Sequence, residues 1–166
     1  RLLSWLEKPR KGPFFAWLHL YDAHAPYEPP LPFRQAYAGK PYLGEIAYMD
    51  YELGRLVRTL QEKGLWDETL VVVTADHGES FDEHGERTHG FFCYGATTRV
   101  PLILSKPVYG TPGQAFEHPV QSIDLAPSIL RLLGLPVDEG MDGLRLDSSA
   151  ERVVYSEARI PHEDFY

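Results

Sequence analysis

The sequence contains a single cysteine, Cys93, among its 166 residues. This excludes an internal disulfide and every zinc motif that requires several cysteines. Basic residues are also scarce, because 16 Lys and Arg stand against 24 Asp and Glu and give a formal net charge of −8. Phosphate contacts need clustered Lys and Arg, so this balance argues against a nucleic-acid-binding protein. Long hydrophobic runs are absent, and the sequence therefore predicts no transmembrane segment.

The chain has the length and composition of about one globular domain. With 166 residues, of which 43% are hydrophobic, it is long enough to bury a core. Its first residues contain neither a start methionine nor the apolar stretch of a secretory signal, from which we expect the chain to be part of a longer protein. The sequence gives no prediction of the cellular compartment.

Short apolar segments alternate with segments of helical periodicity. Strands are predicted at 14–20, 70–74, 100–104 and 152–156, and helices at 44–63 and 123–133. Five prolines between Pro26 and Pro41 predict an extended loop there, and Ser122 is the expected cap of the last helix. The alternation is typical of an α/β fold, a layered sandwich with a mostly parallel sheet flanked by helices.

Polar loops follow two of the predicted strands at their carboxyl ends. One loop begins after Leu20 and the other after Thr74. Ligands of parallel α/β sheets bind beyond these ends, so we expect the two loops to contribute to one shared site.

Asp76 and His77 come directly after the strand predicted at 70–74. A carboxylate and an imidazole at the end of a strand suit a divalent cation. Adjacent side chains on a strand point to opposite faces, but the chain can turn at Gly78 and bring both to one ion. The alternative is an Asp that caps the loop beside an exposed His.

Three further histidines, His24, His84 and His89, stand in these two loops. Histidines on loops bind metals or oxyanions, and a solvated side chain is the alternative for each of them. The isolated His118 and His162 have no partners in the sequence and are interpreted as surface residues.

Other catalytic templates do not fit the sequence. It has no Gly-x-Ser-x-Gly elbow and no glycine-rich phosphate loop. A group of acidic residues after His77 could suggest the paired carboxylates of a glycosidase. We interpret the group as solvated side chains instead. It comprises Glu79, Asp82, Glu83 and Glu86.

Four blocks of the sequence occur in the order that one enzyme family shows. They are residues 19–27 (HLYDAHAPY), 74–79 (TADHGE), 88–90 (THG) followed by 99–103 (RVPLI), and 122–130 (SIDLAPSIL). Through these blocks, residues 5–155 resemble the sulfatase family of the alkaline phosphatase superfamily. The resemblance implies an alkaline-phosphatase-like α/β fold.

The same resemblance implies roles for four residues. Asp76 and His77 would be two ligands of a single divalent cation, which is usually Ca²⁺ and in some relatives Mn²⁺ or Mg²⁺. His24 would contact the sulfuryl oxygens or the leaving oxygen of the substrate, as in bacterial sulfatases. His89 stands where many relatives carry a Lys that binds the sulfate, and a positive charge there would stabilise the transition state.

Two parts of the family pattern are missing from the sequence. There is no Asp-Asp pair of metal ligands and no Cys/Ser-x-Pro-x-Arg motif, whose Cys or Ser becomes the formylglycine nucleophile. Cys93 lacks the rest of that motif, and the segment 105–109 (SKPVY) ends in Tyr instead of Arg. The resemblance thus implies that residues 1–166 are the C-terminal portion of a sulfatase catalytic domain, with an incomplete fold. The partner of this portion would be the missing N-terminal half of the core.

The resemblance predicts that the intact enzyme hydrolyses sulfate esters with the help of a metal, and that the isolated chain is inactive. Many sulfatases carry Asn in place of His77, whereas the His form is similar to that of phosphonate monoester hydrolases and related bacterial sulfatases. Hydrolysis of phosphate monoesters, phosphate diesters or phosphonates is therefore one alternative function. A non-catalytic module that binds a metal or an anion is the other.

Overall fold

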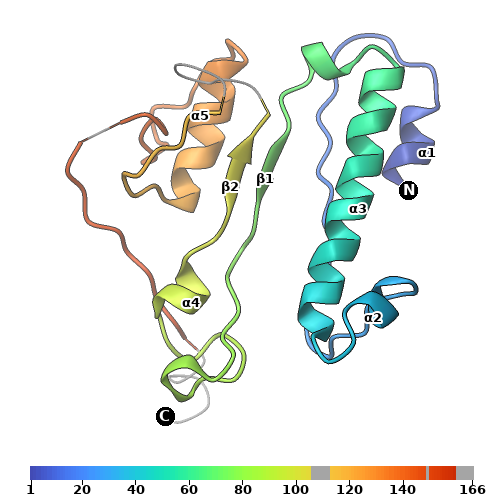
Figure 1. The fold of residues 1–166 in the computed structure, drawn as a ribbon. Helices are drawn as coiled ribbons and strands as arrows, with labels where there is room; N and C mark the ends of the chain where they lie inside the picture. The colour runs from blue at the N-terminus through green and yellow to red at the C-terminus, as the bar shows by residue number, and fades with distance from the viewer. Residues whose placement is uncertain (106–112, 149, 160–166) are drawn as a thin grey trace. The chain divides into compact units, whose positions relative to one another are not determined.

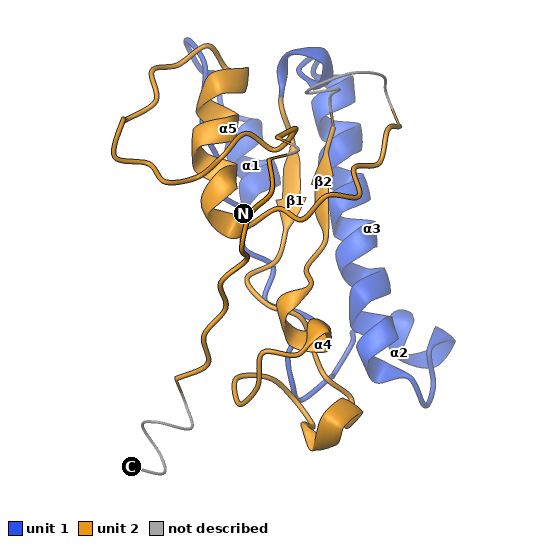
Figure 2. Cartoon of the chain, turned by 90° about the vertical axis from the view of Figure 1, so that its left-hand side faces the viewer, with its two compact units in different colours: residues 1–69 blue, residues 70–166 orange. Residues whose placement is uncertain are grey.

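The structure is a computed structural model, and it describes residues 1–105, 113–148 and 150–159 (Figure 1). The chain divides into two compact units, residues 1–69 and residues 70–166 (Figure 2). The described elements of the first unit are α1 (Leu2–Leu6), α2 (Phe33–Ala36), α3 (Pro41–Glu62) and a 3₁₀ turn at Trp66–Glu68. Those of the second are β1 (Val72–Thr74), β2 (Leu102–Leu104), α4 (Gly95–Thr98), α5 (Leu125–Leu132) and 3₁₀ turns at Glu83–Gly85 and Ser122–Asp124.

The long helix α3 organises the first unit (Figure 1). It confirms the helix predicted at 44–63, and Gly64 follows its end with a φ of +66°, a conformation that glycine adopts without strain. Leu60 of α3 is 2% exposed and Leu6 of α1 is 3% exposed, so these two side chains are at the core of the unit. Neither α3 nor any other described helix is long and apolar enough to span a membrane.

The helix α3 approaches the proline-rich loop closely at Gly44. A Cβ at this position would lie 2.8 Å from Pro29 Cγ and 3.3 Å from Tyr37 Cβ. Gly44 and Pro29 are both buried. The loop therefore packs against the start of α3 in a way that leaves no room for a side chain at position 44.

Two predictions for the first unit are wrong. Residues 14–20 do not form a strand, and Phe15 and Trp17 are 78% and 83% exposed. A strand requires a hydrogen-bonded neighbour, and no described residue of the first unit is in a strand. The proline-rich loop is not wholly extended either, because α2 follows Pro32, which stands at the helix start where a missing N–H is tolerated.

In the second unit β1 and β2 pair antiparallel, with Val73 opposite Ile103. The strands predicted at 70–74 and 100–104 are confirmed in their last three residues. The layered sandwich with a mostly parallel sheet is not confirmed, because the two described strands run in opposite directions. Parallel neighbours need a long crossover, and the longest helix between β1 and β2 is α4, with four residues. Residues 152–156 are not a strand.

The carboxylate of Asp124 joins the start of α5 to the residues that follow the helix. It is fully buried and accepts backbone N–H bonds of 2.8 Å from Gln121 and from Leu144. Arg152 donates two further bonds, of 2.6 and 3.1 Å. Burial acts to raise the pKa of Asp124, but the bonds from Arg152 and the two N–H groups outweigh it, so the pKa is lowered. Asp124, and not the predicted cap Ser122, thus fixes the start of this helix.

The close approach at Gly44 predicts different effects for two glycine variants. Gly44→Ala should lower the free energy of unfolding by about 1–3 kcal/mol, because the new Cβ overlaps Pro29 and overpacks the contact. Gly54→Ala in the same helix is the control, since its Cβ would meet only Arg58 at 3.4 Å. It should raise the free energy of unfolding by roughly 0.5–1 kcal/mol. Urea denaturation measures both values, and equal effects would contradict the packing at Gly44.

The buried pair of Asp124 and Arg152 predicts a loss of stability in acid. Because the folded-state pKa of Asp124 is lowered, its contribution to stability is present above its unfolded-state pKa of about 3.9 and is lost as the pH falls below that value. Arg152→Gln should lower the free energy of unfolding near neutral pH by about 3–5 kcal/mol, because a buried carboxylate loses its partner.

The control for this variant is Arg145→Gln. The pair of Arg145 with Asp147 is half exposed and should contribute only about 0–1 kcal/mol. Denaturation curves between about pH 3 and neutral pH test both variants. An Arg152→Gln protein that keeps the wild-type stability and its decline in acid would contradict the role of the pair.

Candidate functional site

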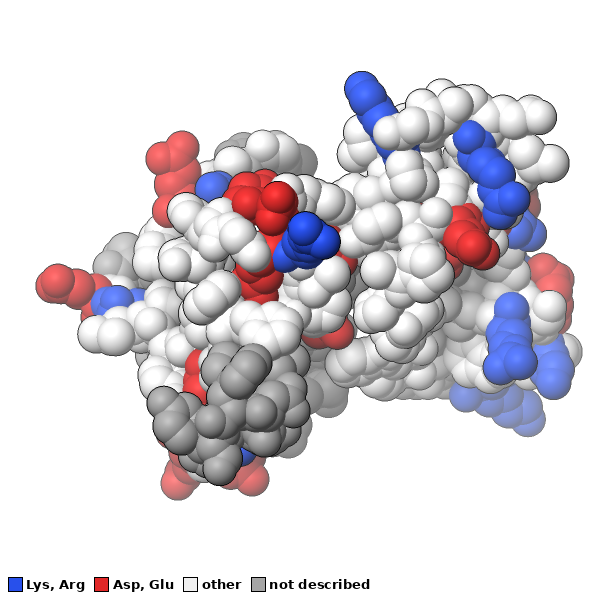
Figure 3. Space-filling view, turned by 90° about the horizontal axis from the view of Figure 1, so that it is seen from below, with Lys and Arg blue, Asp and Glu red and all other residues white. Residues whose placement is uncertain are grey.

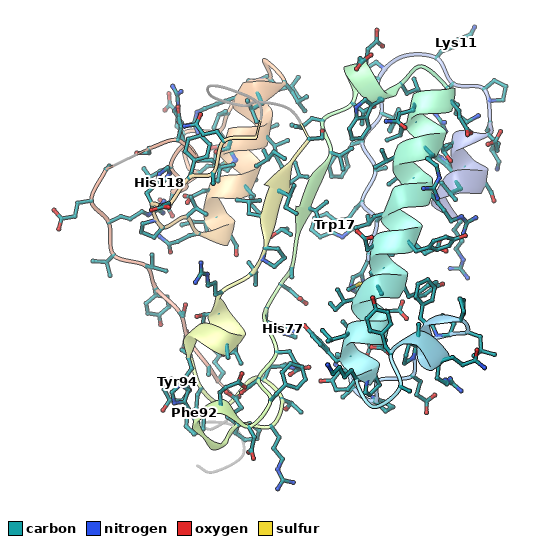
Figure 4. All side chains as sticks on the ribbon, in the orientation of Figure 1. Lys11, Trp17, His77, Phe92, Tyr94 and His118 are labelled. Carbon is teal, nitrogen blue, oxygen red and sulfur yellow. The ribbon has the colours of Figure 1, made fainter. Side chains whose placement is uncertain are left out.

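The predicted site residues belong to different units. His24 lies in the first unit, whereas Asp76, His77 and His89 lie in the second. The three residues of the second unit are on the segment between β1 and β2, and Figure 4 shows His77 where the chain leaves β1. The structure brings His77 and His89 into contact. A shared site that includes His24 stays a prediction.

The imidazole of His24 is held by residues of its own turn. Its Nδ1 lies 2.7 Å from the Ala25 carbonyl oxygen and 3.2 Å from the Tyr21 hydroxyl. The Tyr21 and His24 rings stack with centroids 4.8 Å apart and planes at 24°. Because a carbonyl oxygen can only accept, Nδ1 carries the proton of the neutral ring. The Nε2 atom of His24 is therefore protonated only when the ring is positively charged.

Asp76 and His77 are held close together directly after β1. The Asp76 Oδ1 atom accepts the His77 N–H at 3.0 Å, and His77 Nδ1 lies 2.8 Å from the Gly78 carbonyl oxygen. This contact puts the proton of the neutral His77 ring on Nδ1 and a lone pair on Nε2. Nε2 lies 3.8 Å from Asp76 Oδ2. In the described residues no group of three or more His, Cys, Asp or Glu side chains could hold a metal ion, so this pair would need other ligands.

Gly78 allows a close approach of two backbone segments directly after His77. Its N–H donates to the Thr97 carbonyl oxygen at 2.7 Å, and a Cβ at position 78 would lie 2.1 Å from the Ala96 carbonyl oxygen. The segment after β1 thus packs backbone against backbone on α4. Only glycine fits this approach, and the approach determines where the chain leads after His77.

His89 is in contact with His77 and with a buried carboxylate. The two imidazole rings stack with centroids 3.9 Å apart and planes at 27°. The His89 Nδ1 atom lies 3.1 Å from Glu79 Oε1, and the side chains of His89 and Glu79 are 25% and 6% exposed. Glu79 therefore fixes which edge of the His89 ring can face a ligand.

A second buried carboxylate, Glu86, closes the turn that carries His89. Glu86 is 4% exposed, and its Oε1 atom accepts the N–H groups of Phe91 and Phe92 at 2.8 and 3.3 Å. Within the part of the chain that the structure describes, its Oε2 atom is buried without a hydrogen-bond partner. Along the chain, His89 lies between Glu86 and these two phenylalanines. The hydrogen bonds of the Glu86 carboxylate therefore close the turn in which His89 stands.

The interpretation of the acidic group as solvated is wrong for two of its four members. Asp82 and Glu83 are exposed, and the N–H of Phe81 lowers the pKa of Glu83 by hydrogen bonding to its carboxylate. Glu79 and Glu86 are buried as side chains. The sequence does not distinguish the buried acids from the exposed ones. The donors that allow burial are backbone and ring N–H groups, which are brought together only when the loop folds.

His84 belongs to an exposed aromatic cluster on the same loop. Its ring stacks on Tyr94 with centroids 4.1 Å apart, and Phe92 lies 5.4 Å from Tyr94. Figure 4 shows the Phe92 and Tyr94 side chains beside each other, and both residues come just before α4 in the chain. Phe92 and Tyr94 are 48% and 41% exposed. Exposed rings of this kind offer a surface for flat or apolar groups.

The two remaining predictions for histidines have different outcomes. His118 is half-buried, and its Nε2 atom lies 2.6 Å from the Leu146 carbonyl oxygen. It is therefore not a fully exposed surface residue, as the sequence had suggested. His162 lies outside the described residues, as do residues 106–109 of the segment that comes nearest to the formylglycine motif.

The acidic surplus of the chain is confined to its second unit. Figure 3 shows charged side chains of both signs on one face of the molecule. Residues 1–69 contain nine Lys and Arg and nine Asp and Glu, whereas residues 70–166 contain seven Lys and Arg and fifteen Asp and Glu. The second unit thus carries the whole formal net charge of −8. Such a unit repels anions, so an anion can bind at His77 and His89 only with local positive charge.

Comparisons with known proteins identify similar proteins of one superfamily. A family model described as Sulfatase matches residues 1–135 of the chain. The steryl-sulfatase of Rattus norvegicus is 31% identical over 154 residues, which cover 84% of this chain and 27% of the rat protein. A multifunctional alkaline phosphatase superfamily protein of Trinickia caryophylli is 37% identical over 107 residues, which cover 63% of this chain and 20% of that protein.

A solved structure shows the same relationship in three dimensions. The phosphonate monoester hydrolase of Silicibacter pomeroyi is 38% identical, with a TM-score of 0.59 over 65% of this chain and 21% of that chain. The chain therefore spans between 20% and 27% of the length of these three proteins. The relatives come from mammals as well as from bacteria. The likeness of the His24 segment to bacterial sulfatases therefore does not show that the chain is bacterial.

The turn at Glu86 predicts different effects for two substitutions of this residue. Glu86→Ala should lower the free energy of unfolding by about 1–3 kcal/mol, because the N–H groups of Phe91 and Phe92 lose their acceptor. Glu86→Gln is the control and should have a smaller effect, since it keeps one acceptor oxygen. Urea denaturation measures the difference, and the NMR shift of the His89 ring protons, which lie against His77, reports whether the turn moves. Equal losses in the two variants would contradict the role of the carboxylate.

Proposed function

The chain belongs to the sulfatase family, and on that premise we propose that it supplies metal-binding and oxyanion-binding residues to an enzyme that hydrolyses sulfate esters. The observation that carries the proposal is the stacking of His77 on His89, with the Asp76 carboxylate 3.8 Å from His77 Nε2. A carboxylate and a neutral imidazole suit a divalent cation, and a protonated imidazole suits an anionic substrate.

Asp76 and His77 would bind one divalent cation, most suitably Ca²⁺, with Mn²⁺ or Mg²⁺ as alternatives. Their chemistry fits this role, because the Gly78 carbonyl accepts the Nδ1 proton of His77 and leaves the Nε2 lone pair near Asp76 Oδ2. Two protein ligands are fewer than such cations take, so further ligands would come from outside the described residues. When bound, the cation supplies positive charge that stabilises the oxygens of the substrate.

His89 and His24 would bind and orient the sulfate oxygens. The Nδ1 atom of His89 is held by Glu79, and that of His24 by the Ala25 carbonyl, so Nε2 is the edge of each ring that can face the substrate. A ring whose Nδ1 proton is already donated has an Nε2–H only as the imidazolium. Each histidine would thus contribute a hydrogen bond and a positive charge to the binding of the sulfate.

The nucleophile would come from outside residues 1–166, as a formylglycine made from Cys or Ser. A phosphate-ester or phosphonate hydrolase is the second candidate function, favoured by the 38% identity to a phosphonate monoester hydrolase. Sulfate monoesters and phosphonate monoesters both carry one negative charge. The charge of the site does not separate the two functions, and a comparison of substrates is needed.

The test uses the complete enzyme with 4-nitrophenyl sulfate and a 4-nitrophenyl phosphonate monoester. His24→Ala and His89→Ala should each lower kcat/KM by about 10²-fold, the usual effect of removing one transition-state donor. His84→Ala is the control, because His84 lies on the same loop as His89 but stacks on Tyr94. Unchanged rates in the first two variants would contradict the proposal, and faster turnover of the phosphonate would favour the second candidate.

The 166-residue chain provides a second arm of the test. Without a nucleophile it should release no 4-nitrophenol from the sulfate ester, even with Ca²⁺. Calorimetry should detect weak Ca²⁺ binding that Asp76→Ala abolishes. Turnover by this chain would overturn the proposal that the nucleophile comes from outside residues 1–166. Ca²⁺ binding by the chain, together with no turnover by the complete enzyme, would indicate a non-catalytic module.

A further inference from the structure

A buried carboxylate on α3 holds the turn that carries His24. Glu45 is 4% exposed. Its Oε2 atom accepts the Ala23 N–H at 2.8 Å, and its Oε1 atom accepts the Glu28 N–H at 2.6 Å. His24 lies between these two residues, so a single carboxylate closes the turn from both ends.

We propose that Glu45 is a positioning residue, which fixes the place of the His24 imidazole relative to α3 during the reaction. The inference rests on the proposed function of His24 as an oxyanion-binding group. Glu45 itself touches neither substrate nor cation in this scheme and acts only through the turn.

Packing alone does not explain a glutamate at position 45. Burial of a carboxylate is unfavourable unless hydrogen bonds compensate for the lost water, and an apolar side chain is often as stable on a buried helix face. Both oxygens of Glu45 accept backbone N–H groups, and the ion pairs found among the described residues do not include Glu45. Its charge therefore acts on the turn, because a carboxylate accepts N–H bonds more strongly than a neutral group.

The turn has a conformation that needs such support. Ala23 has a φ of +69°, in the left-handed region that residues with a side chain seldom adopt. Its N–H is one of the two that Glu45 binds. On the far side of the turn, Pro29 packs on α3 where Gly44 leaves room for it. The helix thus holds the turn at Ala23, at Glu28 and at Pro29.

The His24 ring is in turn fixed to this backbone. Its Nδ1 atom contacts the Ala25 carbonyl oxygen and its face stacks on Tyr21. Contacts therefore run without interruption from α3 through Glu45 to Ala23 and on to the imidazole. A displacement of about 1 Å at a catalytic group can lower a rate by roughly 10²-fold, so a loosened turn should be visible in kcat.

A double-mutant cycle on the complete enzyme tests the inference. Glu45→Gln keeps the shape of the side chain but has one acceptor oxygen, so one of the two N–H bonds is lost. With 4-nitrophenyl sulfate, kcat should fall about 10-fold or more while KM stays within about twofold, because a transition-state donor is misplaced. In a His24→Ala background Glu45→Gln should have no further effect on kcat, since it acts through His24.

The control is Glu52→Gln in the same helix. The Glu52 carboxylate pairs with Arg55 at 2.8 Å and not with the turn, so kcat and KM should be unchanged. A Glu45→Gln effect of equal size in both backgrounds, or none in either, would overturn the positioning role and leave the proposed function standing. An unchanged kcat in His24→Ala would overturn the proposed function of His24 and the positioning role with it.

An NMR readout on the 166-residue chain does not depend on activity. The amide protons of Ala23 and Glu28 should resonate far downfield and exchange slowly with solvent, as donors to a carboxylate. Glu45→Asp keeps the charge but is one methylene shorter, so at least one of the two amides should move upfield and exchange about 10-fold faster or more. Wild-type shifts and exchange rates for both amides in Glu45→Asp would overturn the contact on which the inference depends.

Discussion

A carboxylate can be buried only where hydrogen-bond donors surround it, and this requirement shapes the irregular parts of the chain. Glu45, Glu86 and Asp124 are each at most 4% exposed, and each accepts two backbone N–H groups from a loop or turn. The described strands have only three residues each, so the sheet ladder can fix little of the backbone. Side chains that bind the backbone from a distance fix the loops instead.

Two histidines are also held by the backbone, but by its carbonyl groups instead of its N–H groups. The carbonyl groups of Ala25 and Gly78 are acceptors, and they keep the neutral tautomer of His24 and His77 in one form. For His77 this form leaves a lone pair on Nε2, as the proposed metal ligand requires, and for His24 it allows donation from Nε2 only as a cation. The same kind of backbone contact thus fits both of the proposed roles, which differ in the neighbours of each ring.

The sequence predicted the parts of the fold that depend on local patterns. The periodicity of α3 and the apolar runs at β1 and β2 were sufficient for those elements, and the adjacent Asp76 and His77 were expected at the end of β1. The direction of the strand pair and the failure of residues 14–20 to form a strand were not predictable in this way, because both depend on which segments become neighbours.

The buried glutamates were missed for a related reason. Glu79 and Glu86 stand in a polar loop beside exposed acids, and nothing in the order of residues reveals which carboxylate the folded loop will surround with N–H groups. Glu45 did leave a signal, since it is an acidic residue on the buried face of an amphipathic helix. An acidic residue that interrupts the apolar face in this way indicates that the helix hydrogen-bonds to the backbone of a neighbouring loop.

The exposed segment 14–20 has a consequence for work with the purified chain. It is seven residues long, contains no proline and no Asp, Glu, Lys or Arg, and exposes the rings of Phe15 and Trp17. Segments of this composition assemble into intermolecular β-structure when they are accessible. Self-association at this segment should therefore increase with the concentration of the chain. A charged residue at position 17 would act as a gatekeeper against such fibres without altering a buried contact.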